Sequence, residues 1–290
     1  MSTTPPYIII NKQVGETPLQ ALERYRATRP ELTSTPMAYA GRLDPMASGA
    51  LLILIGEECK CQSLYHQLDK AYDFSLLLGV SSDTQDILGR LQWVHTPPSV
   101  PASTSLKEIC HNLTGSITLP YPHFSAKTVK GKPLHVWTLE GRLGEIELPT
   151  RTSRIYRLEP QHVASIPATT LYHNALTRIN SLPTVTEHSK ALGADFRREA
   201  VRADWQAWYQ AYHDQSFPLI HCRCLASSGT YMRSLAALIG KKLGSQGLAY
   251  SIHRLQIGRY QPLWGTWGVW TKRLHRPLPA PDIFLDTSGS

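Results

Sequence analysis

The sequence contains no apolar run close to the roughly 20 residues that a membrane-spanning helix requires. Its first apolar run, Tyr7–Ile10, is also too short for the core of a secretory signal peptide. Cysteine is scarce, and the odd count of five disfavours a disulfide framework. These absences argue against a helical membrane protein and a disulfide-rich secreted scaffold. We therefore expect a soluble protein of a reducing compartment, the cytoplasm.

The few cysteines include two Cys-x-Cys pairs, Cys59/Cys61 and Cys222/Cys224, and His221 precedes the second pair. Structural zinc sites normally separate paired cysteines by roughly two to four residues, whereas a single residue intervenes here. Small buried thiols that alternate along strands explain the same pattern without a metal. We therefore expect no metal site.

Acidic residues are outnumbered, since 22 Asp and Glu face 30 Lys and Arg and leave a net charge of +8. This excess favours a polyanionic partner, because Lys and Arg replace counterions along a phosphate backbone. Charge alone leaves nucleic-acid binding and simple solubility equally open. With 42% apolar and 18% charged residues, the 290-residue chain can bury a sizeable core in one large domain or two modest ones.

Local patterns predict a mixture of strands and helices. Strands are expected at Tyr7–Asn11, Ala71–Val80 and Leu219–Leu225, with several short strands between residues 114 and 165. Helices are expected from the Thr17-Pro18 cap to Ala27, over Ser105–Leu113, over Asp204–Tyr212 with its core-forming aromatic stripe, and over Gly229–Gly244. Met37–Pro45 is expected to be a loop, and Ala50–Ile55 either a buried strand or a buried helix. Because no regular βαβ alternation is present, this order predicts an α+β fold.

The sharpest chemical candidate is Asp44, within the segment AGRLDPMASGALLILIGEECK at residues 40–60. Asp44 lies between two glycines that permit close backbone approach, and Pro45 directly after it disfavours a helix at this point. An acidic side chain just before a buried apolar run is well placed to be held over a cleft. From spacing alone, an Asp that caps the following helix or turn is the more frequent explanation.

The same segment resembles the catalytic motif of the TruB family of pseudouridine synthases, and further motifs follow in the family's order from about residue 7 to residue 260. They are Asn11-Lys12, Lys70-Ala71-Tyr72 with Leu78-Gly79 and Asp83-Thr84, the run PHFSAKTVKGKPL at 122–134, Arg154-Ile155-Tyr156, GTYMR at 229–233 with Leu243-Gly244, and His253-Arg254-Leu255. An ordered series of matches is far more specific than any one of these patterns.

The resemblance implies the pseudouridine-synthase fold, an α+β architecture with a long, bent mixed sheet and helices around a central catalytic cleft. It also implies an isomerase without a cofactor, which detaches uracil at N1, turns it and rejoins it to the ribose through C5. In the resemblance, Asp44 matches the family's nucleophile and Arg233 the arginine that pairs with it. Tyr72 matches the tyrosine that stacks on uracil and is a candidate for the base that removes the migrating proton.

Other residues match family positions that hold the RNA or support the site. These substrate-binding candidates are Lys12, Tyr39, Arg42, Phe124, Lys130, Tyr231 and Leu255. Lys12 matches a lysine that supports the active-site loop, and Tyr231 and Leu255 match pocket-lining positions. For Tyr231 and Leu255 core packing stays open, and for Lys130 a solvated basic face stays open.

The sequence departs from the family pattern in three places. Tyr39 stands where the family usually has a histidine, so the flipped nucleotide is expected to be held differently. Only 30 residues follow Tyr260, too few for the family's C-terminal PUA-type domain, so we expect a catalytic domain over 1–265 and a short tail over 266–290. Residues 180–215 are longer than the family motifs require, and their basic and aromatic residues fit either an RNA-contacting or a merely packed insertion.

The resemblance makes tRNA the expected partner of a monomeric enzyme, with the target uridine in the T arm at position 55. The alternative is a non-catalytic RNA-binding or tRNA-folding protein on the same scaffold. The joint presence of Asp44, Tyr72 and Arg233 argues against it, since a binding module has no need of a buried carboxylate–guanidinium pair. A metal-dependent hydrolase is disfavoured because no Asp/His cluster at ligand spacing accompanies Asp44.

Overall fold

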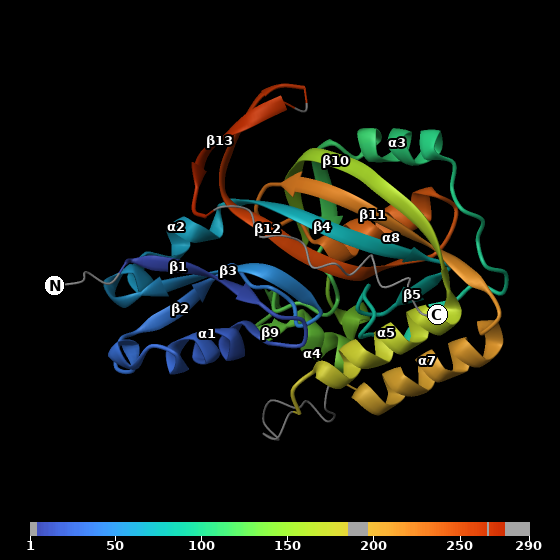
Figure 1. The fold of residues 1–290 in the computed structure, drawn as a ribbon, viewed down its shortest axis with the longest axis horizontal. Coiled ribbons are helices and arrows are strands. Elements are labelled where there is room, and N and C mark those ends of the chain that lie inside the picture. Colours follow the sequence, from blue (N-terminus) through green and yellow to red (C-terminus); the bar gives the residue numbers. More distant parts are fainter. Residues whose placement is uncertain (1–4, 185–196, 266, 276–290) are drawn as a thin grey trace.

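Figure 1 shows a computed structural model of the protein, which describes residues 5–184, 197–265 and 267–275. The main strands are β1 (Tyr7–Lys12), β2 (Met37–Ala40), β3 (Ala47–Ile55), β4 (Asp69–Leu78), β7 (Gly115–Pro120), β10 (Thr150–Pro167), β11 (Ser216–Ala226), β12 (Gly247–Trp264) and β13 (Trp267–Arg273). Two small hairpins are formed by β5 (Val80–Ser82) with β6 (Leu91–Trp93) and by β8 (Thr128–Val129) with β9 (Lys132–Pro133). The helices are α1 (Pro18–Ala27), α2 (Gln62–His66), α3 (Ser103–Asn112), α4 (Leu134–Leu139), α5 (Ala168–Ser181), α7 (Arg198–Tyr212) and α8 (Met232–Lys242), with 3-10 turns η1 (Pro30–Leu32), η2 (Gly56–Cys61) and η3 (Leu143–Glu145).

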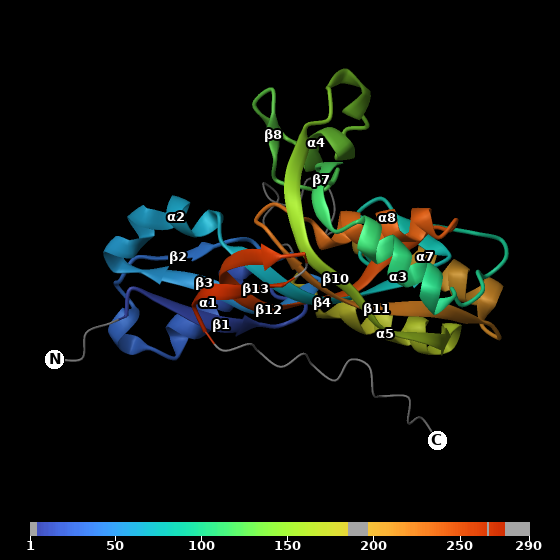
Figure 2. The ribbon, with the colours of Figure 1, turned by 90° about the horizontal axis from the view of Figure 1, so that it is seen from above.

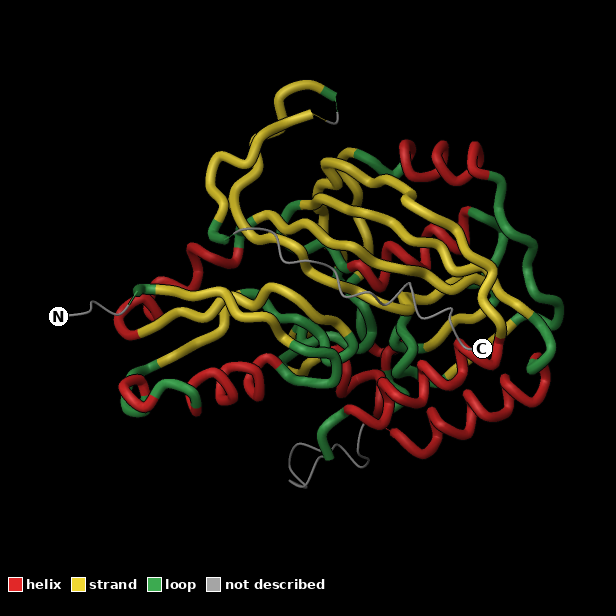
Figure 3. Tube along the Cα trace, viewed as in Figure 1, coloured by secondary structure: helices red, strands yellow, loops and turns green. Residues whose placement is uncertain are grey.

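One nine-stranded sheet runs through the molecule in the order β1-β3-β12-β4-β11-β10-β7, with β2 added to β3 and β13 to β12. Its pairings are antiparallel except for a short parallel contact between β12 and β3. Helices lie on both faces of this sheet (Figures 1 and 3). The mixed sheet with flanking helices confirms the predicted α+β class.

Strand β4 explains how both faces of the sheet are covered. Its alternate side chains Tyr72, Phe74 and Leu76 belong to a core shared with α3 and α8. Leu77 belongs to a second core shared with α5 and α7. A strand enclosed on both faces needs a nearly continuous apolar sequence, and FSLLL within β4 has one. The strand predicted at Ala71–Val80 is confirmed, although it begins at Asp69 and ends at Leu78.

The aromatic stripe predicted over Asp204–Tyr212 forms part of helix α7 and faces the core. Trp205 and Trp208 are fully buried, and the Trp205 indole donates a hydrogen bond of 3.0 Å to the Ile87 carbonyl. Helix α7 packs along α5 (Figure 1). The stripe is therefore core, as predicted, while residues 185–196 of the predicted insertion lie outside the described residues.

The expectation of a loop over Met37–Pro45 is wrong for its first part, because Met37–Ala40 forms strand β2. This strand pairs with the C-terminal half of β3, while β12 pairs with Ala47–Gly49 at its N-terminal end. Strand β2 is only four residues long and directly precedes the Gly- and Pro-containing loop, so the local pattern alone missed it. Ala50–Ile55, for which helix and strand were both open, belongs to β3.

The expectation of several short strands over residues 114–165 is also wrong in part. The structure has a six-residue β7 and an eighteen-residue β10, which pair with each other. Between them, residues 121–149 form a small unit that projects from the body of the molecule (Figure 2). This unit has a hydrophobic core of its own, built on Leu134, Trp137 and Ile146. It can therefore be inserted between the paired strands β7 and β10 without packing into the main core.

The expected boundary at residue 265 falls inside a hairpin. Strand β12 continues to Trp264 and pairs with β13, so residues 267–273 belong to the sheet rather than to a tail. The remainder of the expected tail, residues 276–290, lies outside the described residues. Within the described part of the chain, no helix combines the length and apolar character that crossing a membrane requires.

The two Cys-x-Cys pairs have different surroundings. Cys222 and Cys224 are buried on β11, as expected for thiols along a strand. Cys59 and Cys61 instead lie in the turn η2, so the strand interpretation is wrong for them. Among the described residues, no three His, Cys, Asp or Glu side chains come together as a metal site would require.

Candidate active site

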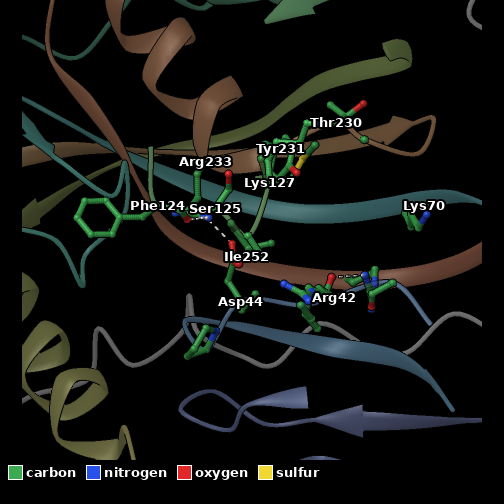
Figure 4. A pocket seen from close by; sticks show the side chains of 18 of the residues that line it. Arg42, Asp44, Lys70, Phe124, Ser125, Lys127, Thr230, Tyr231, Arg233 and Ile252 are labelled. Atoms are coloured by element: carbon green, nitrogen blue, oxygen red, sulfur yellow. Dashed lines mark hydrogen bonds and ion pairs between the residues drawn. The ribbon is translucent and has the colours of Figure 1, made fainter. Parts of the chain in front are cut away.

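A cavity of about 1320 Å³ opens where the loop after β2 meets β4, β12 and the start of α8. Its walls include Asp44, Tyr72 and Arg233, three residues that are far apart in the sequence. Figure 4 shows Asp44 and Arg233 facing each other across this space, with Tyr231 and Phe124 nearby. The cavity is a central cleft between the N-terminal strands and the rest of the sheet.

Asp44 and Arg233 form the charged centre of the cavity. Arg233 Nε lies 2.8 Å from Asp44 Oδ2, an ion pair rather than a well-aligned hydrogen bond. The Asp44 side chain remains 42% exposed, whereas that of Arg233 is only 6% exposed. Asp44 is held in a turn closed by the hydrogen bond from Ala47 N to its carbonyl. The carboxylate is thus open to the cavity while its partner is fixed behind it.

The Arg233 guanidinium also binds two other segments of the chain. Its Nη1 donates 2.8 Å to the Thr84 carbonyl, and its Nη2 donates 3.3 Å to the Phe124 carbonyl. Arg233 is in the first turn of α8, where the helix dipole disfavours a cation. Nearby carboxylates offset this cost and raise the pKa of Arg233 against the opposing effect of its burial.

The second of these carboxylates is Asp86, which the sequence analysis did not single out. Its Oδ2 lies 3.6 Å from Arg233 Nη1, and its Oδ1 accepts hydrogen bonds from Thr84 Oγ1 and Leu88 N. Burial raises the pKa of Asp86, and the charge of Arg233 opposes that rise. The nearby Asp83-Thr84 motif was the only sequence signal that pointed to this turn.

Tyr72 enters the cavity from β4 and is 8% exposed. Burial raises the pKa of its phenol, although the neighbouring Arg254 guanidinium acts in the opposite direction. The phenol is therefore protonated at neutral pH. It offers an aromatic face and a hydroxyl donor, and it has to lose its own proton before it can act as a base.

Arg254 fixes the loop that carries Asp44. The buried guanidinium donates 2.6 Å to the Ala50 carbonyl and 3.2 Å to each of the carbonyls of Arg42 and Gly41. Strand β12 approaches β3 so closely that a Cβ at Gly49 would lie 2.3 Å from the Arg254 carbonyl oxygen. Arg254 belongs to the His253-Arg254-Leu255 motif, but the sequence alone predicted no role for it.

Leu255 does not line the cavity. It is buried next to an irregularity in the pairing of β12 with β4, between Arg254 and Gln256. The residues that β12 contributes to the cavity are Ile252 and Arg254. The prediction that Leu255 lines the pocket is therefore wrong. Its neighbour Arg254 lines the cavity instead.

Two buried lysines lie beneath the site. Lys12 Nζ donates to the carbonyls of Gln13 (2.8 Å) and Glu16 (2.7 Å) and does not line the cavity. Burial lowers the pKa of Lys12 to about 7, although the charges of Glu16 and Asp44 counteract this effect. Lys70 does line the cavity, and burial also lowers its pKa to about 7, with Arg254 adding to the shift.

The other substrate-binding candidates divide between the rim and the projecting unit. Tyr39, Arg42, Phe124 and Tyr231 line the cavity. Lys130 does not, because its Nζ donates to the Glu145 carbonyl within the projecting unit. Its neighbour Lys127 takes that place on the cavity wall, with Nζ 5.4 Å from the centre of the Tyr121 ring.

Among its described residues, the stretch 180–215 reaches the cavity through Arg197 alone. Its guanidinium forms a two-pronged ion pair with Asp83 and lies 4.5 Å from the centre of the Phe124 ring. Arg198, by contrast, is buried and donates to the carbonyls of Ile179 and Leu182. The described part of this stretch is thus packed against the body, with one cation at the rim of the cavity.

Comparison with known proteins adds a family relationship to this geometry. Residues 29–174 match the family described as TruB family pseudouridylate synthase (N terminal domain). A protein named tRNA pseudouridine synthase B from Caldicellulosiruptor saccharolyticus is 34% identical over 152 residues, which cover 52% of this chain and 50% of that protein. Proteins of the same name from Syntrophus aciditrophicus and Bordetella avium are 27% and 28% identical over 87% of this chain.

The alignments cover 62% of the Syntrophus protein and 81% of the Bordetella protein, so the chain spans between half and four fifths of these relatives. Among solved structures, a chain in "Crystal Structure of a Cbf5-Nop10-Gar1 Complex" is similar with a TM-score of 0.50. Its identity is 15%, over 87% of this chain and 48% of that one, so the likeness concerns the fold alone.

Proposed function

Because the chain belongs to the TruB family of pseudouridylate synthases, we propose that it isomerises uridine to pseudouridine in RNA. The observation that carries the proposal is the Asp44–Arg233 ion pair at 2.8 Å inside a cavity that also contains Tyr72. A carboxylate suits this reaction because it can form and then release a covalent adduct. A fixed guanidinium beside it also keeps the carboxylate oriented.

In the proposed reaction, Asp44 attacks either C6 of the uracil or C1′ of the ribose. The N1–C1′ bond breaks, the base turns within the cavity, and a new bond joins C5 to C1′. The bond to Asp44 breaks again, which returns the free carboxylate. The proton on C5 then leaves, and N1 gains one. Arg233 orients the Asp44 carboxylate through their ion pair, and the Tyr72 ring stacks on the base. Because its phenol is protonated, Tyr72 acts as a base only after it has passed its own proton on.

We propose that the substrate is the T-arm uridine of tRNA at position 55, the target implied by the family resemblance. A base inside a folded RNA has to be flipped outward, at a cost of a few kcal/mol that stacking in the cavity offsets. The net charge of +8 and the cavity-lining cations Arg42, Lys127 and Arg151 support an RNA ligand. The proposal includes a monomeric enzyme of the cytoplasm, which the five free cysteines suit.

The test is to incubate the protein with an unmodified tRNA transcript and to measure pseudouridine in the T loop. Asp44→Asn keeps the shape of the side chain and removes its charge, so product should fall to background while the RNA Kd changes less than about threefold. Asp73→Asn is the matched control, because Asp73 also pairs with an arginine, Arg223, but does not line the cavity. That control should retain full activity; product formation by the Asp44 variant would refute the nucleophile assignment.

The second candidate is a non-catalytic RNA-binding protein on the same scaffold. Such a protein gains nothing from burying Arg233 and Asp86 behind the open Asp44, since taking charges out of water costs several kcal/mol per ion. Tight binding of tRNA without any pseudouridine, under conditions where a known pseudouridine synthase is active, would favour this candidate.

A further inference from the structure

The hairpin of β12 and β13 carries an exposed aromatic tip far from the cavity. Trp264 and Trp267 are 88% and 75% exposed, and Leu263 next to them is 69% exposed. In Figure 1 this hairpin extends beyond the rest of the sheet. Large apolar side chains left this open on a soluble surface normally mark a binding site.

The same hairpin carries cations that face each other across the strand pair. Arg259 lies directly opposite Lys272, and Arg273 lies opposite Gly258. All three cations are exposed, and the described residues offer none of them an ion pair within 4 Å. Like charges in direct cross-strand contact destabilise a sheet, so this arrangement favours an anionic ligand.

Acidic side chains do not compensate these charges locally. The sequence from Gly258 to Arg273 contains no Asp or Glu. Asp69, whose carboxylate senses the charge of Arg259, is buried and accepts hydrogen bonds from Tyr260 N and the Tyr156 hydroxyl. The outer surface of the hairpin therefore combines indole rings with a positive field.

The base of the hairpin is anchored, so its tip is held in place relative to the cavity. The Tyr260 ring packs edge-on against Trp270 at 5.6 Å and lies 5.2 Å from Tyr156 of β10. A Cβ at Gly268 would lie 2.6 Å from the Tyr260 ring, so the two strands are tightly apposed. Strand β12 also bears Arg254 of the cavity, and the ten residues from there to Trp264 span up to roughly 30 Å.

We propose that this surface is a second contact for the same RNA, at which unpaired bases stack on the indoles and phosphates meet the cations. The hairpin patch consists of Arg259, Leu263, Trp264, Trp267, Lys272 and Arg273. The ligand is a single-stranded segment of RNA, since exposed aromatic rings beside cations bind unpaired bases without demanding a sequence. The inference rests on the proposed RNA substrate and extends its footprint beyond the catalytic cavity.

The first test compares binding of a full-length unmodified tRNA transcript with that of a short stem-loop that contains only the target loop. Trp264→Ala combined with Trp267→Ala should weaken binding of the full-length RNA about tenfold or more. Binding of the short stem-loop should stay within about twofold. The single-turnover rate at saturating RNA should not change, because the hairpin is remote from the reacting atoms. Trp264→Phe with Trp267→Phe should restore most of the binding.

The second test concerns the charges. Arg259→Gln with Lys272→Gln should reduce the slope of log K against log salt by about one to two, because two phosphate contacts are lost. Lys241→Gln with Lys242→Gln is the matched control, since these exposed lysines lie at the end of α8. The decrease in slope for this control should be less than half of the decrease for the Arg259/Lys272 variant.

The outcomes separate this inference from the proposed activity. Equal affinity of the wild type and the Trp264/Trp267 variant for full-length RNA overturns the RNA contact. A change in self-association without a change in RNA affinity also overturns it and identifies the patch as a protein interface. If the wild type makes no pseudouridine but the Trp variant still loses RNA affinity, the activity fails and the hairpin contact stands.

Discussion

Replacement of Arg233 by lysine tests whether a guanidinium, rather than a positive charge, organises the cavity. Arg233 reaches Asp44 with Nε, Asp86 and the Thr84 carbonyl with Nη1, and the Phe124 carbonyl with Nη2. A lysine has one nitrogen on a flexible stem, so it can keep the charge near Asp44 or the contacts to the carbonyls, but not both.

The magnitude follows from the contacts that lysine gives up. Each hydrogen bond from a charged donor contributes about 1.5–3 kcal/mol, so losing two costs about 3–6 kcal/mol. Part of this loss appears as lower stability, because the carbonyls belong to the loops around residues 84 and 124. We expect Arg233→Lys to lower kcat/KM at least about 100-fold, equivalent to about 3 kcal/mol, and to lower the free energy of unfolding by about 2 kcal/mol.

A double-mutant cycle separates the two parts. Arg233→Met leaves Asp86 buried without its cation and should lower the free energy of unfolding by about 3–5 kcal/mol. Adding Asp86→Asn removes the stranded charge, so the double variant should regain at least about 2 kcal/mol of stability without regaining activity. Urea unfolding and single-turnover pseudouridine formation measure the two quantities. Full activity of Arg233→Lys, or no recovery of stability in the double variant, refutes the role given to the guanidinium.

Two further predictions concern residues around the cavity. The pKa of Lys12 is about 7 in the folded protein against an ordinary value of 10.5, so the unfolded chain binds more protons between these values and stability rises with pH there. The free energy of urea unfolding of the wild type, minus that of Lys12→Met, should therefore rise by about 2 kcal/mol from pH 7 to pH 9; a constant difference contradicts it. Arg197→Gln should lower kcat about tenfold and leave the salt dependence of RNA binding unchanged, because Arg197 is already paired with Asp83; a lower salt slope with unchanged kcat indicates a direct phosphate contact instead.

Features encoded over short stretches of sequence were predictable. The apolar run in β4 and the Trp205/Trp208 stripe each reveal their burial through local periodicity. Asp44 was predictable as a candidate only because several motifs occur together and in order. Its spacing alone did not distinguish a nucleophile from an ordinary capping residue.

The residues that the sequence analysis missed act through contacts between distant segments. Arg254 supports the Asp44 loop by a hydrogen bond to the Arg42 carbonyl, which is 212 residues away in the sequence. Arg233 binds the Thr84 carbonyl, which is 149 residues away. Asp86 becomes a candidate site residue only because the Arg233 guanidinium lies beside it. No local period marks a buried charge, since such a residue resembles a surface residue until its partner is known. Strand β2 was missed for a different reason, because its four residues directly precede a loop whose glycine and proline dominate the local pattern.

The arginines of the stretch 180–215 show how packing changes the meaning of a basic sequence. Arg198 donates to carbonyls around the end of α5, and Arg202 pairs with Glu199 and Asn180. Removing either one therefore disturbs how α7 sits on α5 before it changes any contact with RNA. Arg197 differs because its partner Asp83 lies one residue from Thr84, whose carbonyl accepts a hydrogen bond from Arg233. Through this chain of contacts, the start of α7 braces the turn that holds Asp86 against the Arg233 guanidinium. We therefore expect Arg197 to influence the proposed reaction through position rather than through attraction of phosphate.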